Sequence, residues 1–147
     1  HNSPNTITLR TSIIGHELNS SNSLLEWFLS EKNGVSGYTK AIFSGLPTSE
    51  FARVIQDFIL PNEGLTGLYH LSVEPIDKYS LLKLIADVYD KNIEITPNDS
   101  FVIDRSLNSS KLIELTGYAP PRWRKLIEEM KQQNYKYTQE GDLNVYW

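Results

Sequence analysis

The sequence predicts an α/β fold, one domain in which short strands alternate with amphipathic helices. The clearest unit is residues 67–89, where a mostly apolar run of strand length is followed by Pro75 and then by leucines at helical spacing. A second run, residues 7–14, is dense in β-branched residues, which favour strands. The 147 residues are 39% hydrophobic and 22% charged, the composition of a globular protein with room for one core.

The first elements follow directly from the local pattern. A strand is expected over Ile7–Ile14, and its near-continuous apolar character predicts burial on both faces. After a polar loop, Asn22 or Ser23 is expected to cap a short helix over residues 24–29. Trp27 of this helix is assigned to the core, with a stacking platform as the alternative.

In the middle of the chain, residues 38–43 are expected to form a short strand, and Thr48 is expected to cap the next helix. The buried side of that helix should carry Phe51, Ala52, Val54, Ile55, Phe58 and Ile59. Asp77 is a good N-cap for the helix of the central unit, which runs to Tyr89. The polar face of this helix should turn three charged residues toward water, Lys78, Lys83 and Asp87.

The last third of the chain continues the alternation. Two brief strands are expected, over residues 92–96 and 101–107. Asn108 or Ser109 should cap a short helix that Gly117 closes, and Pro120-Pro121 begins a final helix. The buried stripe of that helix is expected to contain Trp123, Leu126, Ile127 and Met130.

No low-complexity linker and no internal repeat divides the chain, so a single domain over residues 1–147 is expected. Residues 134–147 form an aromatic tail, for which we expect a small hairpin or a partner contact. The chain begins at His1 and soon enters a strand pattern. We interpret it as a fragment that lacks a preceding half; removal of a tag or renumbering is the alternative.

Charge and composition exclude several classes of function. The net charge of −4 and the pI near 5.4 argue against a nucleic-acid groove, which needs clustered Lys and Arg. No apolar run approaches the ~20 residues that cross a bilayer, and no signal-peptide pattern is present, so no membrane contact is expected. The absence of cysteine fits a reducing compartment, and we expect a cytoplasmic protein.

The sequence contains no complete catalytic motif. Glycine-rich nucleotide turns, zinc-protease motifs and nucleophile elbows are absent, and His1, His16 and His70 are too scattered to predict a metal site. Tyr79 and Lys83 have the Y-x-x-x-K spacing by which reductases activate a tyrosine acid. They lie in an amphipathic helix one turn apart, so we interpret them as helix neighbours and predict no catalytic residue in this chain.

Several segments, in order, resemble the extended short-chain dehydrogenase/reductases, and most closely their dTDP-4-dehydrorhamnose reductase and sugar-nucleotide reductase-epimerase branch. The segments that carry the resemblance are LRTSIIG (9–15), GLYHLS (67–72), YSLL (79–82), RSLNSSKL (105–112) and GYAPPRW (117–123). Each is weak alone, but their order and spacing over residues 6–131 are specific. The resemblance covers only the C-terminal half of such an enzyme.

The resemblance implies a division of labour between two halves. In the family, an N-terminal Rossmann domain holds NAD(P) and supplies the catalytic Ser/Thr, Tyr and Lys. This chain would then supply late Rossmann strands, a loop over the nicotinamide and a small mixed α/β substrate domain. By position, the residues implied near the cofactor are Thr11, Ser12 and Ile13, and those implied at the substrate are Gly15, His16, Glu17 and Asn19. Ordinary strand residues are the alternative for Thr11 and Ser12.

A nucleotide diphosphate has to be met by cations or amides. Arg105 is the first candidate, because its polar run stands before the penultimate helix as in the family. Many members carry an Arg-Pro pair several residues earlier, where this chain has Pro97-Asn98-Asp99. Lys40 is the second candidate, with a solvated strand lysine as the alternative, and Arg10 is the third, with a structural ion pair as the alternative.

Two classes of function follow from the resemblance. The first is the substrate-binding portion of an NAD(P)-dependent reductase or epimerase that acts on a 4-keto-6-deoxy nucleotide sugar for surface polysaccharide. A homodimer is compatible with this reading. The second is a non-catalytic nucleotide-binding or regulatory module on the same fold.

Overall fold

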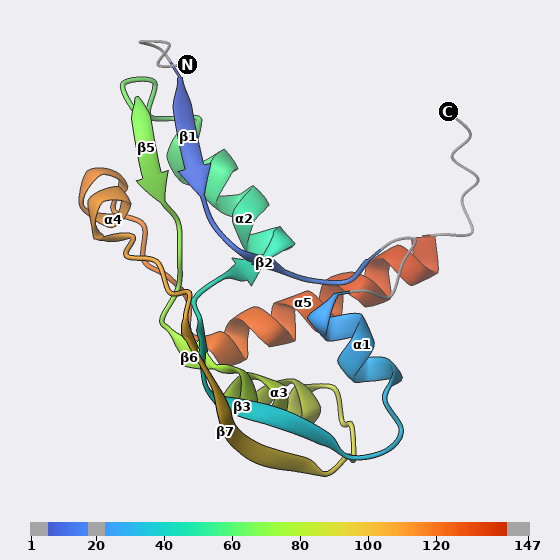
Figure 1. Cartoon of the computed structure of the whole chain (residues 1–147). Coiled ribbons are helices and arrows are strands. Elements are labelled where there is room, and N and C mark those ends of the chain that lie inside the picture. Colours follow the sequence, from blue (N-terminus) through green and yellow to red (C-terminus); the bar gives the residue numbers. More distant parts are fainter. Residues whose placement is uncertain (1–5, 18–22, 141–147) are drawn as a thin grey trace.

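The computed structural model describes the backbone of residues 6–17 and 23–140, and the side chains of these residues up to position 133 (Figure 1). In chain order the elements are β1 (Ile7–Arg10), β2 (Ile13–Ile14), α1 (Leu24–Ser30), β3 (Val35–Phe43), β4 (Leu46–Pro47), α2 (Thr48–Val54), the π-helical segment η1 (Ile55–Ile59), β5 (Gly67–His70), β6 (Ile76–Asp77), α3 (Lys78–Val88), β7 (Ile95–Asp104), α4 (Ser110–Thr116) and α5 (Trp123–Glu140).

The strands form three small groups. β1 pairs in parallel with β5, and β2 pairs in parallel with β4. A three-stranded sheet has the order β6-β3-β7, in which β7 is parallel and β6 antiparallel to β3. Figure 1 shows the β1–β5 pair at one end of the molecule and the three-stranded sheet at the other, with β2 and β4 between them. The predicted α/β fold is confirmed.

The expected strand Ile7–Ile14 is broken into β1 and β2. Thr11 and Ser12 interrupt it, and the carbonyl of Ser12 accepts a hydrogen bond from the amide of Leu46 at 3.0 Å, which brings in β4. The expected burial on both faces is wrong for β1, where half-buried and exposed residues alternate. One face of β1 therefore packs against this chain and the other does not.

The two short strands expected near the C-terminus are one strand, β7. It pairs with β3 along its length, and an irregular register between Tyr38 and Lys40 absorbs the extra residues of β7. Pro97, which cannot donate a backbone hydrogen bond, is tolerated because β7 is an edge strand. The same pairing extends β3 upstream to Val35, beyond the strand expected over residues 38–43.

The helix ends follow the predicted caps in most cases. Ser23 caps α1 and Asp77 caps α3, each through a side-chain oxygen that accepts a backbone amide of the first turn. Gly117 ends α4 in the left-handed conformation, with φ 71°. The prediction for Thr48 is wrong: it is the first residue of α2, and Pro47, which pairs in β4, occupies the cap position.

The core lies where α3 packs on the three-stranded sheet and α5 packs on α3 and β4, and it continues toward β5. Its fully buried members include Leu25, Phe28, Leu46, Leu71, Leu81, Leu82, Ile85, Leu112, Tyr118, Leu126 and Ile127. Trp123 is buried as predicted, and its indole nitrogen donates to the carbonyl of Glu74 at 2.7 Å. Trp27 and Ala52, both expected in the core, are exposed, with Trp27 36% accessible.

The start of the aromatic tail is helical. α5 continues to Glu140, so Tyr135 and Tyr137 belong to a helix and not to the expected hairpin. Residues 141–147 lie outside the described part of the chain.

Candidate functional site

The carboxyl ends of two strand groups meet at one junction. β1 and β5 end there, and the amide of Leu71 donates to the carbonyl of Arg10 at 2.9 Å. β3 ends on the other side, where the amide of Val73 donates to the carbonyl of Ser44 at 3.0 Å. In open α/β sheets, ligands bind beyond the carboxyl ends of parallel strands. This junction is therefore the candidate site.

Buried serines fix the loops of the junction. The hydroxyl oxygen of Ser44 accepts the amide of Leu107 at 2.8 Å, and the hydroxyl of Ser72 donates to the Leu107 carbonyl at 2.7 Å. The hydroxyl of Ser109 donates to the carbonyl of Ser72 at 3.1 Å. The three serines are at most 7% exposed. They tie the segment after β7 to the ends of β3 and β5, so they position the site.

At the same place, position 45 has to be glycine because the chain passes very close to the Ser12 backbone and the Phe43 ring. A Cβ on this residue would lie 2.3 Å from the carbonyl oxygen of Ser12 and 2.3 Å from the ring of Phe43. Only glycine lets the β3–β4 turn pass so near the backbone between β1 and β2.

The residues predicted at the cofactor follow β1: Thr11 and Ser12 lie between β1 and β2, and Ile13 is the first residue of β2. Thr11 and Ser12 are half-buried, and the Thr11 hydroxyl donates to the Ser12 carbonyl at 3.3 Å. Ile13 is 49% exposed.

The loop predicted to line the substrate is anchored to helices. Gly15, His16 and Glu17 are half-buried. One ring nitrogen of His16 lies 2.6 Å from a carboxylate oxygen of Glu26, and the other lies 2.8 Å from the hydroxyl of Tyr89. These contacts join the loop to α1 and to the end of α3, so both nitrogens of His16 are engaged within the chain. Asn19 lies outside the described residues.

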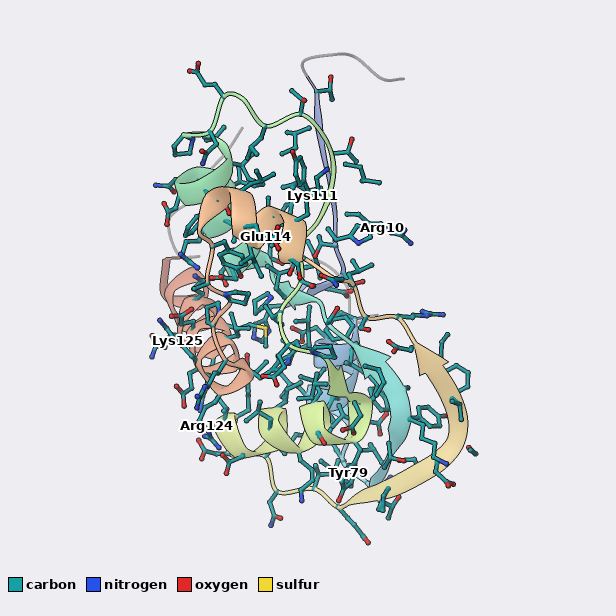
Figure 2. All side chains as sticks on the ribbon, turned by 90° about the vertical axis from the view of Figure 1, so that its left-hand side faces the viewer. Arg10, Tyr79, Lys111, Glu114, Arg124 and Lys125 are labelled. Atoms are coloured by element: carbon teal, nitrogen blue, oxygen red, sulfur yellow. The ribbon has the colours of Figure 1, made fainter. Side chains whose placement is uncertain are left out.

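The three candidate cations differ in their surroundings. The Nζ of Lys40 lies 3.2 Å from a carboxylate oxygen of Asp99, in an exposed pair on the β3–β7 sheet. Arg10 is exposed at the end of β1, and Figure 2 shows it on the opposite side of the molecule from Arg124 and Lys125. Arg105 is exposed just beyond β7, and its amide donates to the carbonyl of Ile42 at 3.1 Å.

Arg105 makes no ion pair within the described part of the chain. The carboxylate of its neighbour Asp104 accepts hydrogen bonds from Ser106, at 2.8 Å from the backbone amide, and these bonds lower the pKa of Asp104. No contact joins Arg105 to Glu114 either, and Figure 2 shows Glu114 on the outer surface of α4. The guanidinium is therefore available to a ligand.

Sequence reasoning missed a fourth cation, Lys78. It was expected in water, whereas Lys83 and Asp87 of the same helix are exposed as predicted. Lys78 is half-buried, with its Nζ 4.3 Å from the centre of the Phe43 ring. Burial, and secondarily the charge of Arg105, lowers the pKa of Lys78. The signal in the sequence was a lysine in the first turn of a helix, where the helix dipole opposes a positive charge.

Tyr79 and Lys83 are helix neighbours, as the sequence analysis proposed. The ammonium of Lys83 lies 5.5 Å from the centre of the Tyr79 ring. A Cβ on Gly37 would come 2.7 Å from the Cα of Tyr79, so this residue packs directly over β3. Figure 2 shows Tyr79 far from Arg10. The pair therefore serves the contact between α3 and β3.

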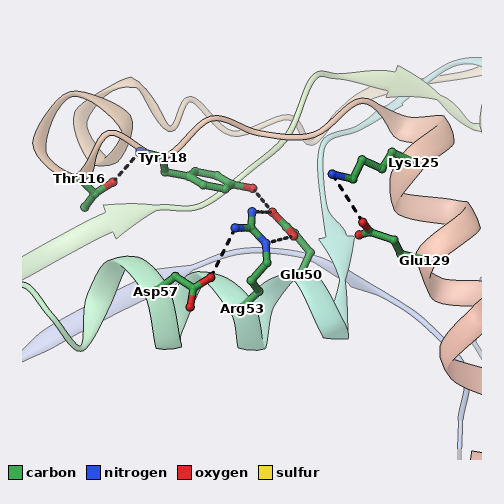
Figure 3. A network of polar contacts seen from close by, with 7 residues as sticks. All are labelled: Glu50, Arg53, Asp57, Thr116, Tyr118, Lys125 and Glu129. Carbon is green, nitrogen blue, oxygen red and sulfur yellow. Dashed lines mark hydrogen bonds and ion pairs between the residues drawn. The ribbon is translucent and has the colours of Figure 1, made fainter. Parts of the chain in front are cut away.

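A second polar cluster was not predicted at all. Glu50 is 2% exposed, and Arg53 binds both of its carboxylate oxygens, at 2.8 and 2.7 Å (Figure 3). The hydroxyl of Tyr118 donates to the same carboxylate at 2.8 Å. Burial and this hydrogen bond raise the pKa of Tyr118, which keeps its hydroxyl a donor. The cluster joins α2 to the segment between α4 and α5, and its groups are satisfied, so it is structural.

Neither a metal centre nor a membrane span is found in the described residues. No group of three or more His, Cys, Asp or Glu side chains among them could hold a metal ion. None of the helices in this part of the chain is both long and apolar enough to cross a bilayer.

Comparison with known proteins gives a structural likeness only. No protein-family model matches the sequence, and no curated protein matches it. The dTDP-4-dehydrorhamnose reductase of Bacillus anthracis, solved with NADP, matches with a TM-score of 0.66 and 18% identity over 86% of this chain and 48% of that one. A reductase of the same kind from Clostridium acetobutylicum matches with a TM-score of 0.69 and 15% identity, over 90% of this chain and 50% of that one. The UDP-N-acetylglucosamine 4-epimerase of Methanobrevibacter ruminantium was solved with UDP-N-acetylmuramic acid. It matches with a TM-score of 0.67 and 17% identity, over 88% of this chain and 46% of that one.

The chain thus spans about half the length of the solved structures that it matches. At these identities the likeness shows the fold. It is a mixed α/β fold with parallel strands that matches about half of an extended short-chain dehydrogenase/reductase.

Proposed function

We propose that this chain is the substrate-binding portion of an NAD(P)-dependent enzyme that modifies a nucleotide sugar. Within that class we propose a reductase of the dTDP-4-dehydrorhamnose type, acting on a 4-keto-6-deoxy nucleotide sugar in surface polysaccharide biosynthesis. The observation that carries the proposal is the junction, where the carboxyl ends of β1, β5, β3 and β7 meet beside Arg105, which forms no ion pair with the described residues. The structural likeness to sugar-nucleotide reductases and epimerases supports it.

The described residues fit part of the cofactor. Thr11 and Ser12 offer hydroxyls, and Ile13 offers an exposed apolar side chain, which suits contact with a nicotinamide ring. No glycine-rich turn opens a helix among the residues described, so the pyrophosphate of the dinucleotide would be held by the half that this chain does not contain. The bound cofactor would supply the hydride.

Substrate binding is the step that this chain can perform. A guanidinium presents several donors in one plane and can meet two phosphate oxygens at once. Arg105 stands just beyond β7, and no carboxylate in the described part of the chain forms an ion pair with it. The serine-fixed loop beside it keeps the backbone in place, so binding requires no rearrangement of the junction.

Arg105→Ala tests this proposal. Hydrogen bonds to charged groups are worth roughly 1.5–3 kcal/mol, so the dissociation constant for dTDP or UDP should rise about ten- to a hundredfold. Calorimetry on the 147-residue chain measures it. Arg124→Ala is the matched control, because Arg124 is also exposed but pairs with Asp87 of α3 at 2.6 Å.

An unchanged affinity together with a lowered melting temperature in Arg105→Ala would contradict the proposal. Arg105 would then hold the segment after β7 in place, and the binding group would be Lys40 or lie in the loop from Gly15 to Asn19.

A non-catalytic nucleotide-binding or regulatory module is the second candidate. The observation that favours it is the packing of Tyr79 against β3, which leaves the described residues without a tyrosine–lysine acid. A glycine-rich turn and a Y-x-x-x-K motif in the protein sequence that precedes this segment would favour the enzyme; their absence there would favour the module.

A further inference from the structure

Two cations flank the end of β3 from opposite sides. Ile42 of β3 pairs with Asp77 of β6 on one side and with Asp104 of β7 on the other. Lys78 and Arg105 are the residues that directly follow these two partners. Because β7 is parallel to β3, Arg105 continues past the end of β3. Because β6 is antiparallel, the backbone of Lys78 lies one step back along β3, but its Nζ reaches the ring of Phe43, the last residue of β3, at 4.3 Å. The positive charge of Arg105 acts on Lys78 there.

No carboxylate neutralises either cation within the described residues. The carboxylate of Asp77 accepts the amide and the hydroxyl of Ser80, at 2.8 and 2.6 Å. The carboxylate of Asp104 accepts from Ser106. Glu74, the acid of the preceding loop, is exposed and forms no ion pair with them. The nearby acids are thus committed to local turns or to solvent.

Lys78 has unfavourable surroundings for a charge. It is half-buried, it faces the repulsion of Arg105, and it stands in the first turn of α3, where the helix dipole opposes a cation. The face of the Phe43 ring, 4.3 Å away, is its one described electrostatic partner of favourable sign. A bound anion would relieve both the repulsion and the desolvation.

We propose that Lys78 is a second cation of the substrate site, and that one diphosphate group bridges Lys78 and Arg105 at the end of β3. This inference rests on the proposed function and adds a residue that it does not include. Lys78 contributes a point charge, while Arg105 contributes the planar pair of donors.

The test is calorimetric titration of the 147-residue chain with inorganic pyrophosphate and separately with UDP and dTDP. Lys78→Gln should raise the dissociation constant of each ligand by about tenfold, the loss expected for one charged hydrogen bond. Lys78→Arg should restore most of it. Lys83→Gln is the matched control, because Lys83 lies on the same helix beside an aromatic ring but is exposed and on another part of its surface. The Lys83→Gln variant should bind all three ligands with the affinity of the wild type.

The double variant Lys78→Gln/Arg105→Ala tests the bridge itself. If one diphosphate contacts both residues, the two losses are not additive, because the second change acts on a ligand already loosened by the first. Additive losses would place the two cations at separate anions and overturn the shared site. Melting temperatures of all variants within a few degrees of the wild type show that the fold is kept.

Proton uptake gives a second readout. Because burial lowers the pKa of Lys78 in the free chain and an anion raises it, binding at alkaline pH should take up protons, and affinity should fall as pH rises through the free-state pKa. Calorimetry in two buffers of different ionisation enthalpy measures the uptake. Lys78→Gln should abolish it, and Lys83→Gln should not.

The outcomes separate this inference from the proposed function. Loss of nucleotide affinity in Arg105→Ala but not in Lys78→Gln overturns the inference and leaves the function standing. Pyrophosphate binding that needs both cations, without tighter binding of UDP or dTDP, supports the inference and contradicts the nucleotide-sugar function. An absence of binding by the wild-type chain overturns both.

Discussion

At the residue scale, the decisive feature is a charge placed inside the molecule. Glu50 carries a carboxylate into an almost fully buried position, and Arg53 and Tyr118 supply three hydrogen bonds to it. Breaking such a pair is costly, because one charge is left buried without a partner. The cluster holds α2 against the segment that leads into α5.

Arg53→Met should destabilise the chain by roughly 3 kcal/mol, the low end for a broken buried pair, because Arg53 is itself 41% exposed. Tyr118→Phe should cost less, about 1.5 kcal/mol, since Arg53 still binds Glu50. Urea unfolding followed by circular dichroism measures both. Arg124→Met, which breaks only exposed ion pairs, should leave the stability almost unchanged. Equal losses in all three variants would show that the Glu50 cluster has no special role.

At the scale of the element, α3 is the helix that organises the three-stranded sheet. It starts directly after β6, its cap is Asp77, and its leucine face packs on β3 and α5. Gly37 of β3 lets the backbone of α3 approach closely at Tyr79. The burial of its apolar positions is graded, because Leu81 is fully buried whereas Leu84 is half-buried.

Leu81→Ala should therefore destabilise the fold by roughly 2–5 kcal/mol, the range for a fully buried leucine. Leu84→Ala should cost clearly less, because part of the side chain is already in contact with water. Thermal and urea unfolding of the two variants provide the comparison. A larger loss at Leu84 would mean that its face is covered by something other than the described residues.

At the scale of the whole molecule, the chain is built from two strand groups that share one junction. The β1–β5 pair has one face that the described residues leave exposed, with Leu68 54% accessible. The chain covers about half the length of the solved structures with the same fold. That another part of the protein covers this face and holds a nicotinamide cofactor stays our proposal.

The 147-residue chain should accordingly consume no NADPH with any nucleotide sugar, because hydride transfer needs a cofactor held against an acid. Absorbance at the NADPH band should follow the buffer blank. Turnover that disappears in Tyr79→Phe would contradict this expectation and would assign catalysis to the Y-x-x-x-K pair. Turnover that survives in Tyr79→Phe would point to a different acid.

Local chemistry was readable from the sequence alone. Ser23 and Asp77 cap the starts of their helices and Gly117 ends its helix, as predicted. Capping depends on one residue and the few backbone groups next to it. The α/β class was also predictable, since the periodicities of strands and helices are local. Thr11, Ser12 and Ile13 were named from a resemblance, and their role at a cofactor stays a prediction.

Tertiary structure alone decided which strands pair and which charges are buried. The run Ile7–Ile14 breaks because Ser12 bonds to Leu46, which is distant in the chain, and the two expected C-terminal strands merge because β3 pairs with both. Glu50 and Lys78 resemble solvent-exposed helix residues in sequence, yet contacts from Tyr118 and Phe43 enclose them. Burial and electrostatic environment depend on segments that are remote in sequence, so helical periodicity could not assign these two residues.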